Sequence, residues 1–361
     1  MVRLTVPLEG RSYDVTIGGG VLVRADDHLP ELPDASTAYV VSDREVSDVY
    51  FSSLAEAIGR RGLAPVLLLA PAGEEAKSLR GYESLLRQLA GREAHRHDPV
   101  VALGGGAIGD LAGFVASTYM RGVPLVQVPT TLTAQVDAAI GGKTAVNLPE
   151  GKNLVGTFAQ PRAVLADLDA LRTLEDRDYR SGLAEVAKYA LTLDVELLAL
   201  LEDDPGPVVA RDVAVMEDVV ARCVTAKARI VAEDERDEAG RLVLNYGHTL
   251  GHALERLDAF RGRTHGEAIA AGMVFAASVA ERRGLAAGIT ERTIRLLRTL
   301  GLEPFDSLPP LEDVLRSLRL DKKYRGGMRF VLLEDVGRPV VVDDVTEDEV
   351  GSALHEIGAP A

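Results

Sequence analysis

Side chains that could bind a metal ion gather in the second half of the chain. His248 and His252 are four residues apart, so on a helix they share one face, and His265 follows soon after. Glu185, in the apolar run SGLAEVAKYAL, could add a carboxylate ligand, although a charge in such a helix can also face solvent. Chemistry alone leaves two sets open, either the three histidines or two of them with Glu185. Either set leaves the open fourth position of a catalytic zinc site.

A glycine-rich turn in the first half could bind a phosphate group. A buried strand at 100–103 runs into three glycines at 104–106, and Gly109-Asp110 leads into an apolar helix. The N–H groups and dipole of a helix N-terminus attract an anion, and glycine allows close backbone approach. The pattern GGGxxGD is neither the dinucleotide fingerprint GxGxxG nor a P-loop. Because a glycine triplet can also be a plain tight turn, the interpretation depends on neighbouring segments.

Neighbouring segments favour the phosphate interpretation. The next apolar strand, 123–128, ends at Pro129-Thr130-Thr131 and leads to a helix that carries Asp137. The segments Gly141-Gly142-Lys143-Thr144 and Gly151-Lys152-Asn153 then follow as loops. Loops rich in glycine, threonine and lysine within one short stretch predict a site for a phosphorylated ligand.

The elements that must position these loops alternate between strand and helix. A hairpin over 2–17 is followed by strands at 37–42 and 64–70, a helix at 46–61 and a helix that Lys77 opens. This alternation predicts an α/β N-terminal domain with a Rossmann-like, mainly parallel sheet.

The carboxyl ends of the strands are the expected ligand edge of such a sheet. Asp43, Gly73, the three glycines at 104–106 and Thr130-Thr131 all follow predicted strands. Asp43 could hold a ribose hydroxyl at this edge, or it could cap the helix that begins after it.

Strand signals nearly vanish after residue 170. Helical periodicity covers 180–203, 209–233, 242–258, 265–284 and 289–301, followed by a short helix at 311–319, two short strands and a last helix at 346–357. We therefore predict two domains, 1–172 and 173–361, of which the second is mostly α-helical and binds the metal.

Composition excludes several classes of function. The chain has 361 residues and a net charge of −15, which repels nucleic acid, so no nucleic-acid partner is expected. No apolar run is long enough for a membrane span, and the N-terminus does not resemble a signal peptide. The single cysteine, Cys223, lies in a helical pattern as a packing residue and cannot form an internal disulfide, which favours a reducing, cytoplasmic location.

Taken together, the motifs resemble the 3-dehydroquinate synthase family of the sugar-phosphate cyclase superfamily. The matching segments span about residues 100–335 in the family's order and spacing. They read GGGAIGDLAGFVASTYMRG, QVPTTLTAQVDAAIGGKTAVNLPEGKN, RSGLAEVAKYAL, EDERDEAGRLVLNYGHTLGHALE, HGEAIAAGM and DKKYRGGMRFVLLEDVG. The combination is far more specific than any single motif in it.

The resemblance implies a lyase that uses NAD and a divalent metal, zinc by default, with cobalt fitting the same ligands. It would convert 3-deoxy-D-arabino-heptulosonate 7-phosphate to 3-dehydroquinate and phosphate in the shikimate pathway of aromatic amino acid biosynthesis. Hydride would pass from C5 to NAD⁺, phosphate would be eliminated with the substrate's own phosphate as base, and hydride would return. Ring opening and an intramolecular aldol would then close the carbocycle.

The resemblance also implies the ligands of the metal and of the substrate. Glu185, His248 and His265 would bind the metal, which moves His252 beside the substrate. The substrate phosphate would contact Lys152, Asn153, Asn245, His252, Lys322 or Lys323, and Arg121 of a neighbouring subunit in a homodimer. The substrate carboxylate would contact Lys227 and Arg241, since arginine grips a carboxylate with two hydrogen bonds. A lone Lys227 would otherwise be interpreted as solvated surface.

Three further residues, Asp137, Lys143 and Lys188, would lie near the reacting hydroxyls and adjust proton positions. The implied NAD contacts all belong to the first domain or its boundary. They are Asp43, Glu74, Lys77, Gly105, Gly106, Asp110, Thr130, Thr131, Lys143, Lys152 and Thr173.

Departures from the family pattern are small. Ala107 and Ala187 stand where the family often has a β-branched residue. Asp43 is followed by Arg44 and Glu45, where the family often has Asn two residues after the Asp. These changes affect the predicted adenosine contacts and leave the chemistry unchanged.

Three alternative functions remain open to the sequence. Sister cyclases act on sugar phosphates without a carboxylate, and the presence of Lys227, Arg241 and Asn245 disfavours them. A metal-dependent polyol dehydrogenase would share the glycine loop and the helical metal domain but would produce net NADH. A non-catalytic regulatory homologue would be expected to lack the metal ligands.

Overall fold

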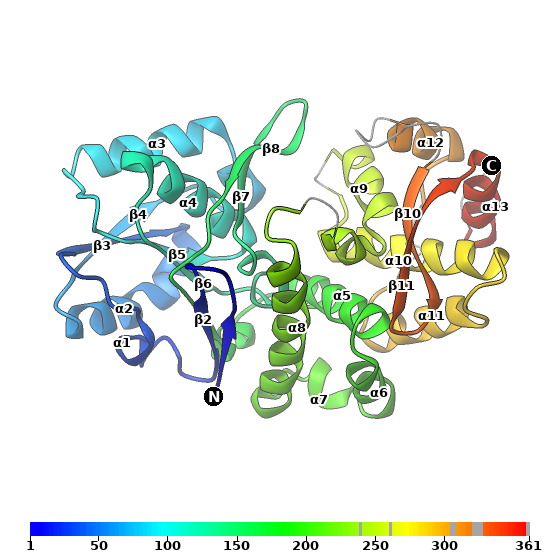
Figure 1. Cartoon of the computed structure of the whole chain (residues 1–361), viewed down its shortest axis with the longest axis horizontal. Coiled ribbons are helices and arrows are strands. Elements are labelled where there is room, and N and C mark those ends of the chain that lie inside the picture. Colours follow the sequence, from blue (N-terminus) through cyan, green and yellow to red (C-terminus); the bar gives the residue numbers. More distant parts are fainter. Residues whose placement is uncertain (238–239, 260–261, 304–307, 320–327, 359–361) are drawn as a thin grey trace. The chain divides into compact units, whose positions relative to one another are not determined.

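The computed structural model describes residues 1–237, 240–259, 262–303, 308–319 and 328–358. The chain divides into two units, each made of two stretches (Figure 1). Unit 1 comprises Met1–Leu174 and Val213–Arg236, and unit 2 comprises Glu175–Asp212 and Asp237–Ala361. The predicted boundary at 172/173 falls two residues before the first crossing, at 174/175. The division differs from two continuous domains, because helix α8 (Val213–Glu233) belongs to unit 1.

Unit 1 is built on a seven-stranded sheet in the order β1-β2-β9-β6-β5-β3-β4. Its strands are β1 (Val2–Val6), β2 (Tyr13–Gly18), β3 (Thr37–Ser42), β4 (Ala64–Leu69), β5 (Val100–Gly104), β6 (Leu125–Pro129) and β9 (Ala163–Asp167). Neighbouring strands are parallel except for β1 with β2, which form the predicted N-terminal hairpin. The predicted Rossmann-like, mainly parallel sheet is therefore confirmed.

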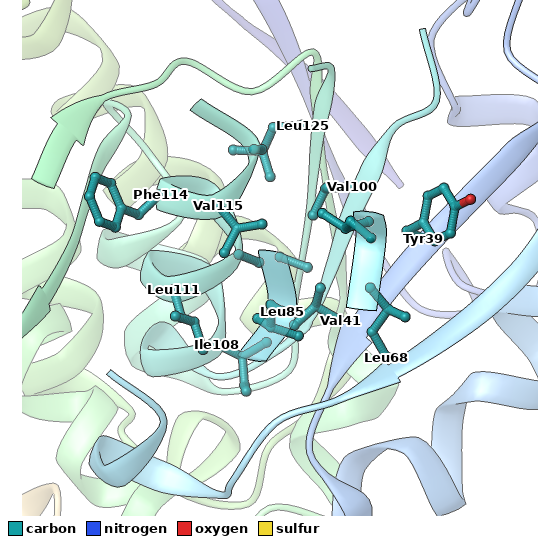
Figure 2. Close-up of a cluster of buried hydrophobic side chains, with 14 of the residues drawn as sticks. Tyr39, Val41, Leu68, Leu85, Val100, Ile108, Leu111, Phe114, Val115 and Leu125 are labelled. Atoms are coloured by element: carbon teal, nitrogen blue, oxygen red, sulfur yellow. The ribbon is translucent and has the colours of Figure 1, made fainter. Parts of the chain in front are cut away.

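Helices on the two faces of this sheet enclose two hydrophobic cores. They are α1 (Ala25–His28), α2 (Arg44–Arg60), α3 (Leu79–Ala90) and α4 (Gly106–Thr118). Because side chains alternate along a strand, Val40 packs with α1 and α2 while Val41 packs with α3 and α4. Figure 2 shows the second core, in which Ile108, Leu111 and Val115 of α4 face the sheet.

The segments around Lys143 and Lys152, predicted as loops, are strands. β7 (Lys143–Leu148) and β8 (Gly151–Phe158) form an antiparallel hairpin in unit 1. Glycine and polar residues interrupt the alternation of apolar and polar residues by which a strand is predicted. A Cβ on Gly156 of β8 would lie 2.1 Å from the carbonyl oxygen of Thr144 on β7, so only glycine fits where the two strands approach this closely.

Short helical turns connect the strands of unit 1 and correct two further predictions. They are η1 (Gly73–Ala76), η2 (Tyr119–Arg121), η3 (Ala134–Ala138) and η4 (Leu168–Arg172). Lys77 follows η1 and does not open α3, because the Ser78 side chain accepts a hydrogen bond from Gly81 N and caps that helix. Asp137 lies on η3, a single turn of π-helix, where a regular helix was predicted.

Unit 2 is mostly helical, as predicted, with one hairpin. Its elements are α5 (Asp176–Thr192), α6 (Val195–Asp203), α7 (Gly206–Val209), η5 (Gly240–Asn245), α9 (His248–Leu257), α10 (His265–Arg282), α11 (Ile289–Thr299), α12 (Leu311–Arg319), β10 (Met328–Asp335), β11 (Arg338–Val345) and α13 (Glu347–Glu356). Two predicted helices are divided. The helix predicted over 180–203 is interrupted at Asp194, which caps α6. The helix predicted over 242–258 is interrupted at Gly247, whose φ of 78° separates η5 from α9.

Helix α10 forms the centre of unit 2. Every residue from Ala268 to Ala280 is buried, so the helix is apolar all round. α5, α9, α11, α13 and β10 pack against it. Among the described residues, none of the helices combines the length and hydropathy that a membrane crossing requires.

Gly113 offers a test of the packing in unit 1. It lies on α4, and a Cβ there would come within 2.3 Å of Cγ2 of the buried Thr144 on β7. We expect Gly113→Ala to lower the free energy of unfolding by about 1–3 kcal/mol through overpacking. The helical Gly59, whose Cβ would meet nothing within 4 Å, is the control. Gly59→Ala should stabilise by up to about 1 kcal/mol. Equal denaturation midpoints for the two variants would contradict this packing.

Candidate functional site

The carboxyl ends of the parallel strands bring the predicted cofactor residues of unit 1 to one edge of the sheet. Asp43 follows β3, Glu74 and Lys77 follow β4, and the glycine turn follows β5. Thr130 and Thr131 follow β6. The strand order reverses between β3 and β5, and such a switch point is where ligands bind in open parallel sheets. Thr173 follows η4 and shares a hydrogen bond with Tyr50 Oη.

Close packing explains why glycine stands at positions 104–106. They have no positive φ, and a Cβ on Gly105 would lie 3.0 Å from Thr131 Cγ2. Gly105 alone joins β5 to α4, and it gives this helix no side-chain cap. By contrast, Asp43 Oδ1 accepts from Val46 N and caps α2, while the predicted ribose contact of this carboxylate stays a prediction. The N-terminus of α4 therefore presents backbone N–H groups at the ligand edge, as an anion site requires.

A polar network links predicted cofactor residues to a predicted phosphate residue within unit 1. The buried Lys77 Nζ donates to Asp110 Oδ2 and to Asn153 Oδ1, both at 2.6 Å. Asn147 completes the network, since its Oδ1 accepts from Asn153 N at 2.9 Å and its Nδ2 donates to Glu74 Oε1 at 2.7 Å. Burial raises the pKa of the Asp110 carboxyl although Lys77 opposes it. Sequence reasoning missed Asn147, because a single asparagine in a strand gives no signal.

Lys227 and Asp137 are also in contact within unit 1. Lys227 Nζ donates to Asp137 O at 2.6 Å and to Asp137 Oδ1 at 2.8 Å. Lys227 is only 7% exposed on α8, so it does not belong to a solvated surface. Two other predicted residues, Lys143 and Arg121, are exposed, and Lys152 is half-buried with Nζ 3.9 Å from Glu74 Oε1.

Unit 2 brings together Glu185, His248 and His265. Glu185 lies on α5 with no solvent exposure, while His248 and His265 begin α9 and α10. Glu185 Oε1 lies 3.5 Å from His248 Nε2 and 3.0 Å from His265 Nε2. One ligand atom from each residue lies within 4.8 Å of the others. Among the described residues, these three form a group that could hold a metal ion. The ring of His252 lies 5.4 Å from that of His248 and 6.3 Å from that of His265.

The separation of Glu185 Oε1 from His248 matches that of two ligands on a tetrahedral metal, and the separation from His265 is slightly shorter. Bonds of about 2.0–2.2 Å at tetrahedral angles place neighbouring ligand atoms roughly 3.3–3.5 Å apart. Of the two ligand sets that chemistry left open, the geometry selects the one that contains Glu185. A carboxylate and two imidazoles, with no fourth protein ligand in this group, are the donor types that an open catalytic zinc site uses.

Local sequence features explain why the three side chains converge. Gly266 N donates to Ser181 Oγ at 2.9 Å, and a Cβ on Gly266 would lie 2.2 Å from Ser181 O. The first turn of α10 therefore rests directly on α5, one turn before Glu185. Thr264 and Glu267 form a capping box there, and Arg177 grips the Glu267 carboxylate with two hydrogen bonds.

Buried charges of both signs surround Glu185. Lys188 Nζ lies 2.5 Å from Glu185 Oε2. Burial raises the pKa of the Glu185 carboxyl, but Lys188 and the two histidines outweigh burial and hold that pKa well below its usual value. Burial lowers the pKa of His265, but the carboxylates of Glu185 and Glu255 outweigh it and raise that pKa to about 10. Sequence reasoning missed Glu255, because the last residue of GHALE is typical of a helix surface.

The remaining predicted residues of unit 2 lie on or beyond η5. Arg241 is 1% exposed on that turn, and Asn245 is half-buried at its end. Lys322 and Lys323 lie outside the described residues.

The chain is similar over nearly its whole length to two solved synthases. One is a 2-deoxy-scyllo-inosose synthase complexed with carbaglucose-6-phosphate, NAD⁺ and Co²⁺, with a TM-score of 0.85, 29% identity, and coverage of 98% of this chain and 99% of that one. The other is a 2-epi-5-epi-valiolone synthase from Streptomyces hygroscopicus subsp. jinggangensis 5008 with NAD⁺ and Zn²⁺, with a TM-score of 0.86, 30% identity and 96% coverage of both chains.

Sequence comparison identifies the family. The models for the N-terminal and C-terminal parts of 3-dehydroquinate synthase match residues 67–181 and 182–324. A 3-dehydroquinate synthase from Pelobacter propionicus is 43% identical over 352 residues, which cover 96% of this chain and 97% of the relative. The chain belongs to the 3-dehydroquinate synthase family, as the sequence motifs predicted.

The raised pKa of His265 predicts a pH dependence of the metal-free protein. The folded pKa, about 10, exceeds the ordinary value of 6.5. The associated stability is therefore complete below about pH 6.5 and is lost as the pH rises toward 10. We expect the thermal midpoint of metal-free protein to fall between pH 7 and pH 10, and to fall less in His265→Gln. Parallel pH profiles for the two proteins would refute this assignment.

Proposed function

We propose that the chain catalyses the conversion of 3-deoxy-D-arabino-heptulosonate 7-phosphate to 3-dehydroquinate and phosphate. The observation that carries the proposal is the convergence of Glu185, His248 and His265 in a chain of this family. The reaction is a carbon–oxygen lyase step, in which phosphate leaves and a carbocycle forms. Family membership and the retained set of cationic side chains support this substrate, which carries a phosphate and a carboxylate.

The proposed cofactors are NAD and a divalent metal, zinc or cobalt. When bound, the metal acidifies a coordinated substrate hydroxyl, and NAD⁺ accepts and later returns a hydride. Glu185, His248 and His265 would bind the metal, and the proposal is supported by the closeness of their ligand atoms, which lie within 4.8 Å of one another. The residues of the ligand edge of unit 1, from Asp43 to Thr173, would bind NAD, with the pyrophosphate at the N-terminus of α4.

We infer that side chains of opposite charge match the two ends of the substrate. Lys152, Asn153, Asn245 and His252 would bind the phosphate with Lys322 or Lys323, and Lys227 and Arg241 would bind the carboxylate. The contact of Lys227 with Asp137 supports this role, because it holds a buried ammonium group in one orientation. The network of Lys77 supports the role of Asn153 in the same way, since two hydrogen bonds fix that residue.

Proton positions would be controlled by Asp137, Lys143 and Lys188. Lys188 would lie near the reacting hydroxyls and would keep Glu185 ionised. Asp137 and Lys143 would contact the reacting hydroxyls. We also infer a homodimer in which Arg121 reaches the phosphate of a neighbouring copy. This inference is supported by the exposure of Arg121 and by its left-handed backbone, at φ 65°, which costs energy that a contact could offset.

The direct test is phosphate release from 3-deoxy-D-arabino-heptulosonate 7-phosphate. Purified protein would be assayed with NAD⁺, with and without a chelator, while absorbance reports NADH and mass spectrometry identifies the product. We expect metal-dependent phosphate release with no net NADH, because the hydride returns in each turnover. Release from sedoheptulose 7-phosphate instead would assign the chain to a sister cyclase. NADH accumulation with a simple polyol would make it a dehydrogenase.

The metal assignment is tested by His265→Ala, with His355→Ala on α13 as the matched control in the same unit. We expect the first variant to lose bound metal in elemental analysis and at least about 100-fold in kcat, since it removes a ligand of the group that polarises the substrate. The exposed His355 contributes nothing to the site, so its variant should keep both. A metal-free but fully active His265→Ala would refute the ligand set.

A further inference from the structure

Glu255 is a buried carboxylate whose position the proposed reaction does not use. It lies on α9, is 5% exposed, and its Oε1 is 3.5 Å from Nδ1 of His265. The other nitrogen of that ring, Nε2, faces Glu185 at 3.0 Å. The His265 ring is therefore held between two carboxylates, one at each nitrogen, and only Nε2 points toward the cluster of ligand atoms.

The second histidine of the cluster is held in a different way. Nδ1 of His248 lies 3.0 Å from the carbonyl oxygen of Tyr246, and Nε2 again faces Glu185. A carbonyl oxygen can only accept, so it fixes the proton of His248 on Nδ1 and leaves Nε2 as the donor of electrons to a metal. Glu255 stands at the equivalent position for His265, with a full negative charge in place of a neutral carbonyl.

A partner behind a histidine ligand has two physical effects. It fixes the tautomer and the ring orientation, and a carboxylate partner also makes the coordinating nitrogen a stronger base. The charges agree with this arrangement. With a divalent cation on the three ligands, Glu185, Lys188 and the cation sum to +2, and Glu255 lowers that sum to +1 in a region where Glu185 and Lys188 have almost no exposure.

We propose that Glu255 is a positioning residue of the metal site, which holds the Nδ1 proton of His265 and so presents Nε2 to the metal. This inference rests on the metal site of the proposed function and names a residue that the ligand set does not include. Glu255 does not touch the metal or the substrate in this role. Its place seven residues after His248 on α9 puts it two turns along the same helix face, so one helix carries a ligand and the partner of another ligand.

The test measures metal affinity instead of turnover. Full-length protein, stripped with a chelator, is titrated with Zn²⁺ in competition with a chromophoric chelator, for wild type, Glu255→Gln, Glu255→Ala and the control Glu202→Gln. Glu202 is a matched glutamate of unit 2 whose carboxylate pairs with Arg292 at the surface. We expect Zn²⁺ affinity to fall about 10–100-fold in both Glu255 variants, with alanine the weaker binder, and to stay within twofold of wild type in Glu202→Gln.

A spectroscopic readout separates positioning from a merely structural role. In the Zn²⁺-loaded wild type, ¹H–¹⁵N spectra of histidine-labelled protein should show His265 with its proton on Nδ1 and slow exchange of that proton. In Glu255→Ala this proton should exchange fast, while the circular dichroism spectrum and the signals of histidines distant from the site stay unchanged. Glu255→Gln keeps the shape of the side chain, so it remains informative if the alanine variant fails to fold.

The outcomes separate this inference from the proposed function. Wild-type affinity in both Glu255 variants, with an unchanged His265 proton, would overturn the role of Glu255 and leave the metal site intact. A wild-type protein that binds no Zn²⁺ would overturn both.

Discussion

A carboxylate without solvent exposure is the constraint around which unit 2 is organised. Glu185 lies in the middle of α5, where an ionised side chain is stable only if cationic or hydrogen-bonding groups compensate it. Lys188 supplies a positive charge from the next turn of the same helix, and His248 and His265 approach from two other helices. Both histidines stand in the first turn of their helices, so the starts of α9 and α10 both lie beside this carboxylate.

Unit 1 meets the opposite requirement, because it must attract negative charge in a strongly acidic protein. It does so with few full charges. The parallel strands deliver backbone N–H groups to one edge, and α4 begins there with no side chain occupying its N–H groups. The buried Lys77 is held between Asp110 and Asn153, so its charge is fixed in place and partly neutralised. Such a site favours a ligand that combines anionic groups with hydroxyls, and it does not attract anions indiscriminately.

Local signals made part of this arrangement predictable from the sequence. The start of α10 at His265 follows from the capping box of Thr264 and Glu267, and the parallel sheet follows from alternating strands and helices. The hairpin β7–β8 escaped prediction because Gly141, Gly142 and Gly151 stand at or just before the starts of its two strands, where glycine indicated loops. The ligand set needed either the geometry or a family resemblance, since spacing on a helix favours His248 with His252. Asn147 and Glu255 contact predicted site residues, and nothing in their local sequence indicates such contacts.

The membership of α8 in unit 1 has a consequence for the order of folding during synthesis. The chain leaves unit 1 at residue 174, returns for residues 213–236 and leaves again, so that unit is completed only after part of unit 2 has been made. α8 packs against β1, β2 and η3, and its Glu217 binds the amino group of Met1 across 216 positions of sequence. Until the ribosome has released residue 236, β1, β2 and η3 therefore lack the helix that packs against them. Chaperones that protect exposed apolar surface would be needed by these elements until α8 has been made.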